Sequence, residues 1–531
     1  MRRTGATRPR AVAAVLVLLT VAGSAPAVAT TTSTTAPAAA PSWTVYHGNT
    51  TGSGVATAVS SVSLSTRAWT SLTLDGQLYG EPLVSGGRIF VATENDTVYA
   101  LSATDGAVEW SSHVGSPVPS GSLPCGNISP SVGITGTPVI DEARSELYVV
   151  ADELVHGSPT HELVGLSTVT GRTEFTQGVD PSGSTAAALL QRTGLTLDAG
   201  RVVFGFGGNY GDCGSYRGWV ISVPEAGGTA STFDVDAADG ESRGAIWMGG
   251  AAPVVDAGGN IWVTAGNGSV ASAGSAYDNS DSVLELSPSL HLLQYFAPSE
   301  WASNNATDLD LSTAPALLPD GQVVAAGKSR IVYLLKGSAL GGIGGQKAAL
   351  PSGCGDDIDG GVAVVGTTVY LPCLSGTIAV QASASPAALR LLWTSSAGGG
   401  PPIVAAGLVW TIGQNGQLYG LDPSTGAVRQ HATVGAPANH FPTPSVGAGL
   451  LLASSANRVV AFSAPAAAAT PPSSPTSTAV PATTTTVPAT TTTAPAQGGS
   501  SDAWAIAPAI AGGLVVVGVA TWALVRRRRR Q

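Results

Sequence analysis

One short pattern recurs through most of the chain and limits the folds available to it. It joins an apolar strand, a polar turn and a second strand, as in VYALSATDGAVEW from Val98, LVGLSTVTGRTEF from Leu163 and LYGLDPSTGAVRQ from Leu418. Weaker copies begin at Val220, Val283, Val332, Ile378 and Val459. Successive copies are spaced by roughly 65, 57, 63, 49, 45, 41 and 41 residues, and self-similarity at such spacings is typical of repeat architectures.

Most copies follow another strand-like run, such as GRIFVATEN or SELYVVADE, and several of these runs follow a short strand that contains Pro, such as GEPLV or GTPVI. The repeating unit is therefore three or four short strands joined by Gly, Asp and Asn turns. About 40 to 50 residues per four-stranded unit is typical of a propeller blade. The sequence predicts an all-β, eight-bladed propeller. A pair of β-sandwiches is the alternative, and eight copies of one motif favour the propeller.

The two ends of the repeat region lack complementary strands. The last copy, VVAFSA, has no following strand, whereas STRAWTSLTLDG, from Ser65, has no preceding partner. We expect the strand of Trp69 to pair with the strand of Val459 and to complete the eighth blade, because ring closure removes two open sheet edges. One compact domain is predicted over residues 42–463.

The segment before this domain has the composition of an export signal. Residues 1–29 place four arginines before an apolar run and a small-residue cleavage site, which is typical of a secretory signal peptide. Residues 30–41 form a Thr/Ala/Pro-rich linker. We therefore expect the domain to be exported.

The segment after the domain has the composition of a stalk and a membrane anchor. Residues 464–501 are rich in Pro and Thr and cannot bury enough apolar surface to fold. Residues 502–525 predict a transmembrane helix, and a tail with five arginines follows at residues 526–531. A buried core helix is the alternative, but its length and the arginine run disfavour it. Because arginines resist translocation, we expect a single-pass cell-membrane protein with an extracytoplasmic propeller and a cytoplasmic C-terminus.

The charge of the chain excludes one class of partner. The formal net charge is −10, and the basic residues concentrate at the two termini. The exported domain is therefore acidic, which argues against binding to nucleic acid.

Four cysteines in an exported domain predict two disulfides among three pairings. Cys354 and Cys373 flank one hairpin, whereas Cys125 and Cys213 lie in insertions of early blades, on what we expect to be one face. These positions favour the pairs Cys125–Cys213 and Cys354–Cys373.

VYALSATDGAVEW resembles the tryptophan-docking repeat of the pyrroloquinoline quinone (PQQ) propellers, the quinoprotein alcohol dehydrogenase-like family. In that family the Trp packs between blades and the Thr/Asp-Gly turn fixes the hairpin. The resemblance covers nearly the whole domain. It implies the fold and leaves the function open, because one fold serves many functions.

The resemblance also implies positions for a PQQ and Ca²⁺ site. Asp212, in GNYGDCGSYRGWV, matches an acid that ligates calcium and is usually Glu in the enzymes. Trp247 matches the residue that stacks on the quinone, and Asn267 matches a calcium-ligating amide. A hard cation such as Ca²⁺ takes several oxygen ligands, so these residue types suit that site.

Three further residues complete the implied site. Asp308, in DLDLSTAPALLPDG, matches the catalytic base, and Asp310 is the acid two residues later, which we assign as a further metal ligand. Lys328, in AAGKSRIVYLL, matches a Lys that contacts the quinone oxygens. The aspartate would accept a proton from an alcohol while the cofactor accepts hydride.

The chain also departs from the enzymes. Only Cys125 stands where they carry two adjacent cysteines, Asp212 is shorter than Glu, and the sequence contains no C-x-x-C-H haem motif. Aspartates are also typical turn formers, Trp247 is equally typical of a core aromatic residue, and Asn267 lies in a GNGS turn. An inherited, empty pocket is therefore the alternative to a working site.

Two functions follow from these observations. The first is a membrane-anchored binding or scaffolding module, whose partner is an extracytoplasmic protein or a small molecule. The alternative is a PQQ- and calcium-dependent dehydrogenase that oxidises alcohols or sugars. For either function we expect the ligand on the face of the early blades, because the longest spacings and the matched residues lie between Cys125 and Lys328.

Overall fold

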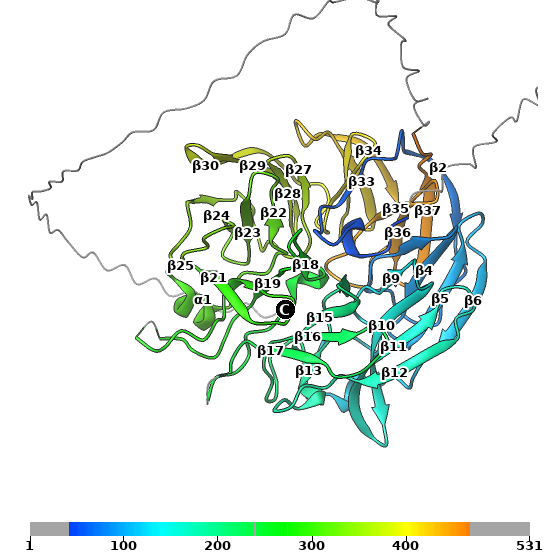
Figure 1. Cartoon of the computed structure of the whole chain (residues 1–531). Coiled ribbons are helices and arrows are strands. Elements are labelled where there is room, and N and C mark those ends of the chain that lie inside the picture. The colour runs from blue at the N-terminus through cyan, green and yellow to red at the C-terminus, as the bar shows by residue number, and fades with distance from the viewer. Residues whose placement is uncertain (1–41, 238–239, 273, 468–531) are drawn as a thin grey trace, which may run out of the picture. The chain divides into compact units, whose positions relative to one another are not determined.

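A computed structural model describes residues 42–237, 240–272 and 274–467. The described chain forms eight four- or five-stranded sheets arranged around a common centre (Figure 1), and a separate two-stranded sheet. The prediction of an all-β, eight-bladed propeller is confirmed. Each of the eight motif copies forms the third strand of its blade, which explains why their spacing follows the blade length.

The strands of the first four blades, from the centre outward, are β3–β6 (Leu83–Ser85, Arg88–Ala92, Thr97–Ser102, Val108–His113), β9–β12 (Val139–Asp141, Glu146–Val155, Ser158–Ser167, Thr173–Gly178), β14–β17 (Thr196–Asp198, Arg201–Gly208, Trp219–Pro224, Ser231–Asp234) and β18–β21 (Val254–Val255, Ile261–Ala265, Ser282–Leu286, Leu292–Ala297). Those of the last four are β22, β23, β24 and β26 (Ala316–Leu317, Gln322–Ala326, Ile331–Lys336, Ala348–Pro351), β27–β30 (Ala363–Val365, Thr368–Cys373, Gly376–Ala384, Ala387–Ser395), β31–β34 (Ile403–Ala405, Leu408–Ile412, Gln417–Leu421, Val428–Thr433) and β35, β36, β37 and β2 (Ser445–Gly447, Leu450–Ser455, Arg458–Ser463, Ser63–Thr70).

The burial of the strands changes from the centre of the ring to its rim. The second and third strands carry nearly continuous apolar runs, and β16, β20 and β23 are buried along almost their whole length. Both faces of such a strand are covered by neighbouring blades, which removes the need for polar alternation. The fourth strands β6, β12 and β34 instead alternate between exposed and half-buried residues, because they face solvent.

The ring closes by pairing strands from the two ends of the domain. β2 pairs antiparallel with β37, with Trp69 opposite Ala461 and Thr70 opposite Val460. The predicted closure is therefore confirmed: the unpaired strand near the N-terminus is the outer strand of the eighth blade.

Docked tryptophans join several blades. The indole nitrogen of Trp69 donates a hydrogen bond to the Ala103 carbonyl at 2.9 Å, and its ring covers Gly106, whose φ of 72° requires glycine. A Cβ at Gly106 would lie 2.5 Å from that ring, so a larger residue would prevent the docking. Trp110 docks in the same way on the next blade and Trp393 on the seventh. The Gly of the repeated turn is thus the surface on which the preceding blade's Trp packs.

An N-terminal strap, residues 43–56, runs past the inner strands before the chain reaches β2. Its backbone hydrogen-bonds to the first strands of blades 1, 2, 4, 6 and 7, through Val84, Ile140, Val255, Val364 and Val404. The last two strap residues form β1 (Val55–Ala56), which pairs with β31.

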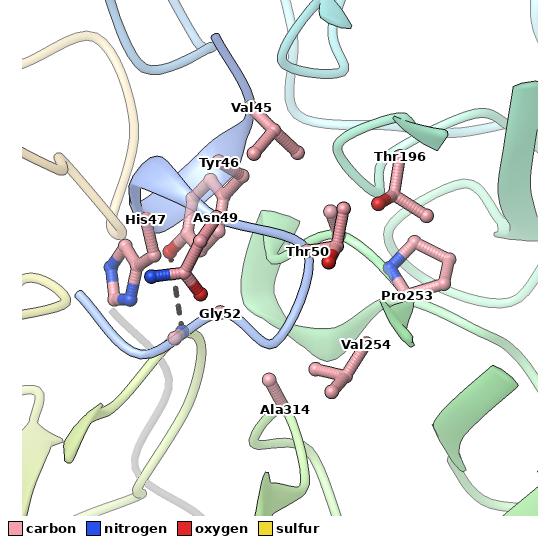
Figure 2. Close-up of a pocket in the computed structure, with 12 residues that line it drawn as sticks. Val45, Tyr46, His47, Asn49, Thr50, Gly52, Thr196, Pro253, Val254 and Ala314 are labelled. Atoms are coloured by element: carbon pink, nitrogen blue, oxygen red, sulfur yellow. Dashed lines mark hydrogen bonds between the residues drawn. The ribbon is translucent and has the colours of Figure 1, made fainter. Parts of the chain in front are cut away.

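The side chains of the strap fill the centre of the ring. Tyr46 and His47 stack with ring centroids 4.3 Å apart, and both are buried (Figure 2). The Tyr46 hydroxyl lies 3.3 Å from the Thr443 hydroxyl and accepts a hydrogen bond from the Gly361 amide. The cavity beside them has a volume of only about 10 Å³, room for about one water molecule.

Both predicted disulfides are present, Cys125–Cys213 and Cys354–Cys373. The first joins insertions near blades 2 and 3, and the second joins the loop before β27 to the end of β28. Other insertions form β7 (Val118–Pro119) with β8 (Ser131–Val132), β13 (Leu189–Leu190), the helix α1 (Trp301–Thr307) and β25 (Gly342–Ile343). The early blades carry most of these additions, in line with their longer spacings.

The predicted signal peptide (1–29), linker (30–41), transmembrane helix (502–525) and tail (526–531) lie outside the described residues, as does most of the stalk. Residues 464–467 are described and still pair with the chain near Val59, through a bridge to Ala466. None of the helices within the described ranges has the length and apolar character needed to cross a membrane.

Candidate functional site

Lys328 is the centre of a charged cluster between blades 4 and 5. It lies in the turn between β23 and β24, and its side chain is 16% exposed. The ammonium nitrogen lies 2.7 Å from Oδ1 of Asp308 and 3.0 Å from Oδ1 of Asp310. The same nitrogen lies 5.5 Å from the ring centroid of Trp247, within reach of a cation–π contact. We call Lys328, these two aspartates, Trp247 and Asn267 the Lys328 cluster.

The two aspartates of the cluster differ in environment. Asp308 follows α1 in the left-handed conformation, with a φ of 58°, and its side chain is 64% exposed. Asp310 is buried, and its Oδ2 packs against Gly266. A Cβ added at Gly266 would lie 2.5 Å from this oxygen. Burial raises the pKa of Asp310, and the Lys328 ammonium partly opposes that change. Burial by itself lowers the pKa of Lys328, but the two carboxylates reverse the direction and raise it. The result is a charged lysine held by two acids.

Asn267 and Trp247 complete the cluster from blade 4. The Asn267 amide nitrogen donates to Oδ1 of Asp308 at 3.3 Å, while its own Oδ1 is buried without a hydrogen-bond partner among the described residues. Trp247 is half-buried, and its indole nitrogen donates to the Gly208 carbonyl at 3.0 Å. Five of the six residues matched by the resemblance are therefore brought together.

Asp212 is held by a different partner. It accepts a hydrogen bond of 2.6 Å from the Tyr216 hydroxyl and has a φ of 52°, the backbone of a turn residue. Within the described part of the chain, no hydrogen bond or ion pair joins Asp212 to the Lys328 cluster. Its nearest link is indirect, because the Tyr216 ring covers Gly208, which Trp247 also contacts.

These positions do not fit a calcium ion and a quinone as the resemblance implies. Ca²⁺ takes six to eight oxygen ligands, whereas the described residues contain no group of three or more His, Cys, Asp or Glu side chains arranged to hold a metal ion. The Lys328 ammonium lies between the two carboxylates that a cation would bind, and it also faces the Trp247 ring. Cys125 is bonded to the distant Cys213, not to an adjacent cysteine.

A second charged group lies between blades 1 and 2, and the sequence patterns did not reveal it. This acidic cluster consists of Glu94, Asp96, Asp152 and Glu153, all buried. Burial, reinforced by the neighbouring carboxylates, raises the pKa of Asp96 to about 9 and that of Asp152 and Glu153 to about 7. Neither carboxylate oxygen of Asp96 has a hydrogen-bond partner within the described ranges. Glu94 and Asp96 come from the turn between β4 and β5, and Asp152 and Glu153 are adjacent in β10, so the group forms only where blades 1 and 2 meet.

The third feature is a buried arginine. Arg192 precedes the first strand of blade 3 and is 8% exposed. Its guanidinium carbon lies 5.8 Å from the ring centroids of both Tyr79 and Phe441. These three residues are separated by more than 100 positions, and only ring closure brings blades 8 and 1 beside each other.

An open groove lies at the other end of the blades. It has a volume of about 750 Å³ and is lined by residues at the turns that precede β23 and follow β24, among them Asp320 and Ser338. Its buried polar groups are largely engaged already: Trp262 donates to Asp256, and Glu285 accepts from Asn260 and Gln294. Gln322 also lines the groove, and its Oε1 is buried without a hydrogen-bond partner among the described residues.

Eight four-stranded blades, docked tryptophans and a closing N-terminal strand define the class of PQQ-like propellers. The chain belongs to the family whose model is described as outer membrane protein assembly factor BamB, and this model matches residues 55–283 and 376–508. No curated protein matches the chain.

Solved structures of similar fold include three dehydrogenases. The quinohemoprotein alcohol dehydrogenase of Comamonas testosteroni is 15% identical, with a TM-score of 0.60 over 81% of this chain and 82% of that one. The enzyme ADHIIG of Pseudomonas putida HK5 is 12% identical, with a TM-score of 0.58 and 81% of each chain covered. A europium-containing methanol dehydrogenase is 12% identical, with a TM-score of 0.55 over 80% and 98%. At these identities the likeness shows the fold.

Proposed function

We propose that this protein is an extracytoplasmic propeller, anchored in the cell membrane through residues 502–525, that acts as a binding or scaffolding module. One observation carries the proposal: the Lys328 ammonium pairs with Asp308 and Asp310 and faces the Trp247 ring. The residues that correspond to a base, a metal ligand and a stacking surface thus contact the Lys328 side chain, which lies between the two carboxylates that a cation would bind.

Two further features support a binding role. Large exposed side chains lie next to matched residues in the chain: Tyr210, two residues before Asp212, is 69% exposed, and Leu309, next to Asp308 of the Lys328 cluster, is 38% exposed. Exposed aromatic and apolar residues beside a polar cluster are typical of contact surfaces. The family description also names an assembly factor, a role that rests on binding other proteins.

The experiment is site-specific photo-cross-linking in the native host. A photoreactive residue replaces Tyr210 in one variant and Val365 in another. Val365 is 43% exposed and is the last residue of β27, before the turn to β28, at the opposite end of the blades. We expect a discrete adduct from position 210 and none from position 365. Equal adducts from both positions, or none from either, would contradict a specific binding face.

The convergence of Trp247, Asn267, Asp308 and Lys328 favours a second candidate, a PQQ- and calcium-dependent dehydrogenase. The buried, unpartnered Oδ1 of Asn267 is an oxygen that a metal ion would use. This function requires Lys328 to release at least one aspartate when the cofactor binds.

Titration of the purified full-length chain with PQQ and Ca²⁺ separates the two candidates. The binding module predicts no heat of binding and no dye reduction. Dye reduction that depends on PQQ, and that Asp308→Asn abolishes while quinone binding persists, would establish the dehydrogenase instead. In that case Trp247→Ala would weaken quinone binding by removing the stacking surface.

A further inference from the structure

Arg192 carries a buried positive charge for which the described structure provides no ionic partner. No carboxylate of the described residues lies within 4.0 Å of its guanidinium nitrogens, and the guanidinium makes no hydrogen bond to a described residue. An isolated charge buried in this way is costly. Its stabilisation comes from the rings of Tyr79 and Phe441, each at 5.8 Å.

The groups that face Arg192 do not neutralise it by contact. The Glu94 carboxylate acts on Arg192 through its charge without an ion-pair contact; its Oε2 accepts hydrogen bonds from the Gly133 amide at 2.8 Å and from the Thr135 hydroxyl at 3.1 Å, and its Oε1 has no hydrogen-bond partner among the described residues. The other facing groups are the phenols of Tyr79 and Tyr46. Burial raises the pKa of both phenols, which remain neutral near pH 7.

The backbone around Arg192 is shaped to leave room for the guanidinium. Gly250, from the loop before blade 4, lies against it, and a Cβ at that position would come within 2.2 Å of Nη1. Tyr79 and Phe441 remain partly exposed beside it. Arg192 itself keeps 8% of its surface exposed.

From this geometry we propose that Arg192 is the anchor of an oxyanion site, which binds the carboxylate group of a small acidic ligand. A guanidinium presents two parallel N–H donors that match a carboxylate, and such charge-assisted pairs are among the strongest hydrogen bonds in proteins. The Tyr79 and Phe441 rings fix the position of the guanidinium before the ligand arrives, which reduces the entropy lost on binding. The proposal names a ligand class for the binding module and so rests on that proposed function.

The first measurement is the thermal unfolding midpoint of the full-length chain without added ligand. Arg192→Met removes the charge and keeps most of the apolar stem. Because functional sites store unfavourable charge at the expense of stability, we expect the midpoint to rise by about 2 °C, the shift that corresponds to ~1 kcal/mol in a large domain. Arg172→Met, at a side chain that is 73% exposed, is the matched control and should leave the midpoint unchanged. A lower midpoint for Arg192→Met would show a structural arginine and contradict the proposal.

The second measurement is binding. The same chains are titrated with succinate, with inorganic phosphate and with chloride at equal ionic strength, by calorimetry and thermal shift. We expect succinate to bind and stabilise the natural chain and Arg172→Met, and to bind Arg192→Met at least about tenfold more weakly, the loss expected for a charged hydrogen bond. The affinity of Arg192→Lys for succinate should lie between those of the natural chain and Arg192→Met, since lysine keeps the charge but lacks the two parallel N–H donors of the guanidinium.

Each other result overturns the proposal. Succinate binding that Arg192→Met does not weaken places the anion elsewhere, and binding of phosphate alone refutes the carboxylate assignment. The absence of any anion effect on the natural chain removes the site. These outcomes are distinct from a failure of the proposed function. PQQ-dependent dye reduction would contradict the proposed function, whatever the result with anions.

Discussion

Lys328 and Asp310 form an ion pair of 3.0 Å in which the carboxylate is almost fully buried. The pair joins the turn between β23 and β24 to the segment that follows α1, so it fixes the position of Asp308 as well. Breaking such a pair by removing one partner leaves an uncompensated buried charge.

Lys328→Met should therefore destabilise the protein by about 3 kcal/mol, measured as the free energy of unfolding in urea. The double variant Lys328→Met with Asp310→Leu should recover most of this loss, because it removes both charges. A single variant as stable as the natural chain would show that the pair contributes nothing.

Closure of the ring should be essential for cooperative unfolding. Deleting residues 42–75 removes the strap and β2, and exposes the edge of β37. We expect a broad, non-cooperative melt by circular dichroism, while Trp69→Ala, which keeps the strand, should cost about 3 kcal/mol and remain cooperative. A truncated chain that melts like the intact one would contradict the role of closure.

The stability should fall as pH rises, because of the acidic cluster. The pKa of Asp96 is raised to about 9 in the folded state, whereas an unfolded Asp titrates near 4. The folded state therefore binds more protons between these values. The contribution of Asp96 to stability is fully present below pH ~4 and is lost progressively up to pH ~9, at most about 1.4 kcal/mol per pH unit.

Asp96→Asn should flatten this dependence, as measured by unfolding midpoints from pH 5 to 9. Asp320→Asn, at an exposed position, is the control and should keep the natural slope. A natural chain whose midpoint does not change over this range would refute the assignment.

The two disulfides should contribute unequally. They close loops with sequence separations of 88 and 19 residues, and a longer loop restricts the unfolded chain more. Replacing Cys125 and Cys213 by Ser should cost about 4 kcal/mol, and replacing Cys354 and Cys373 about 3 kcal/mol. Non-reducing peptide mapping checks the pairing itself, and a peptide linking Cys125 to Cys354 would contradict it.

The sequence by itself determined the architecture, because a propeller repeats one local unit. The turn in VYALSATDGAVEW places Gly106 where Trp69 docks, and both residues belong to recurring motifs that can be compared along the chain. The unpaired strand at each end of the repeats was enough to predict the pairing of β2 with β37, since an open sheet edge is unfavourable.

The environment of each site residue was decided only by the tertiary structure. The resemblance placed Asp308, Asp310 and Lys328 at matching positions, but their ion pairs depend on how blades 4 and 5 pack. Asp212 lies in a matching segment as well, yet Tyr216 holds its carboxylate.

Arg192 is the clearest case of a residue whose environment only the tertiary structure decided. Nothing near it in the chain marks a site, because its two aromatic neighbours come from blades that meet only when the ring is closed. Local motifs report contacts within a blade and between consecutive blades. Burial of a charge depends on contacts between residues hundreds of positions apart, and no short sequence pattern predicts such contacts. The strands could therefore be predicted from the sequence, whereas the electrostatics of the site could not.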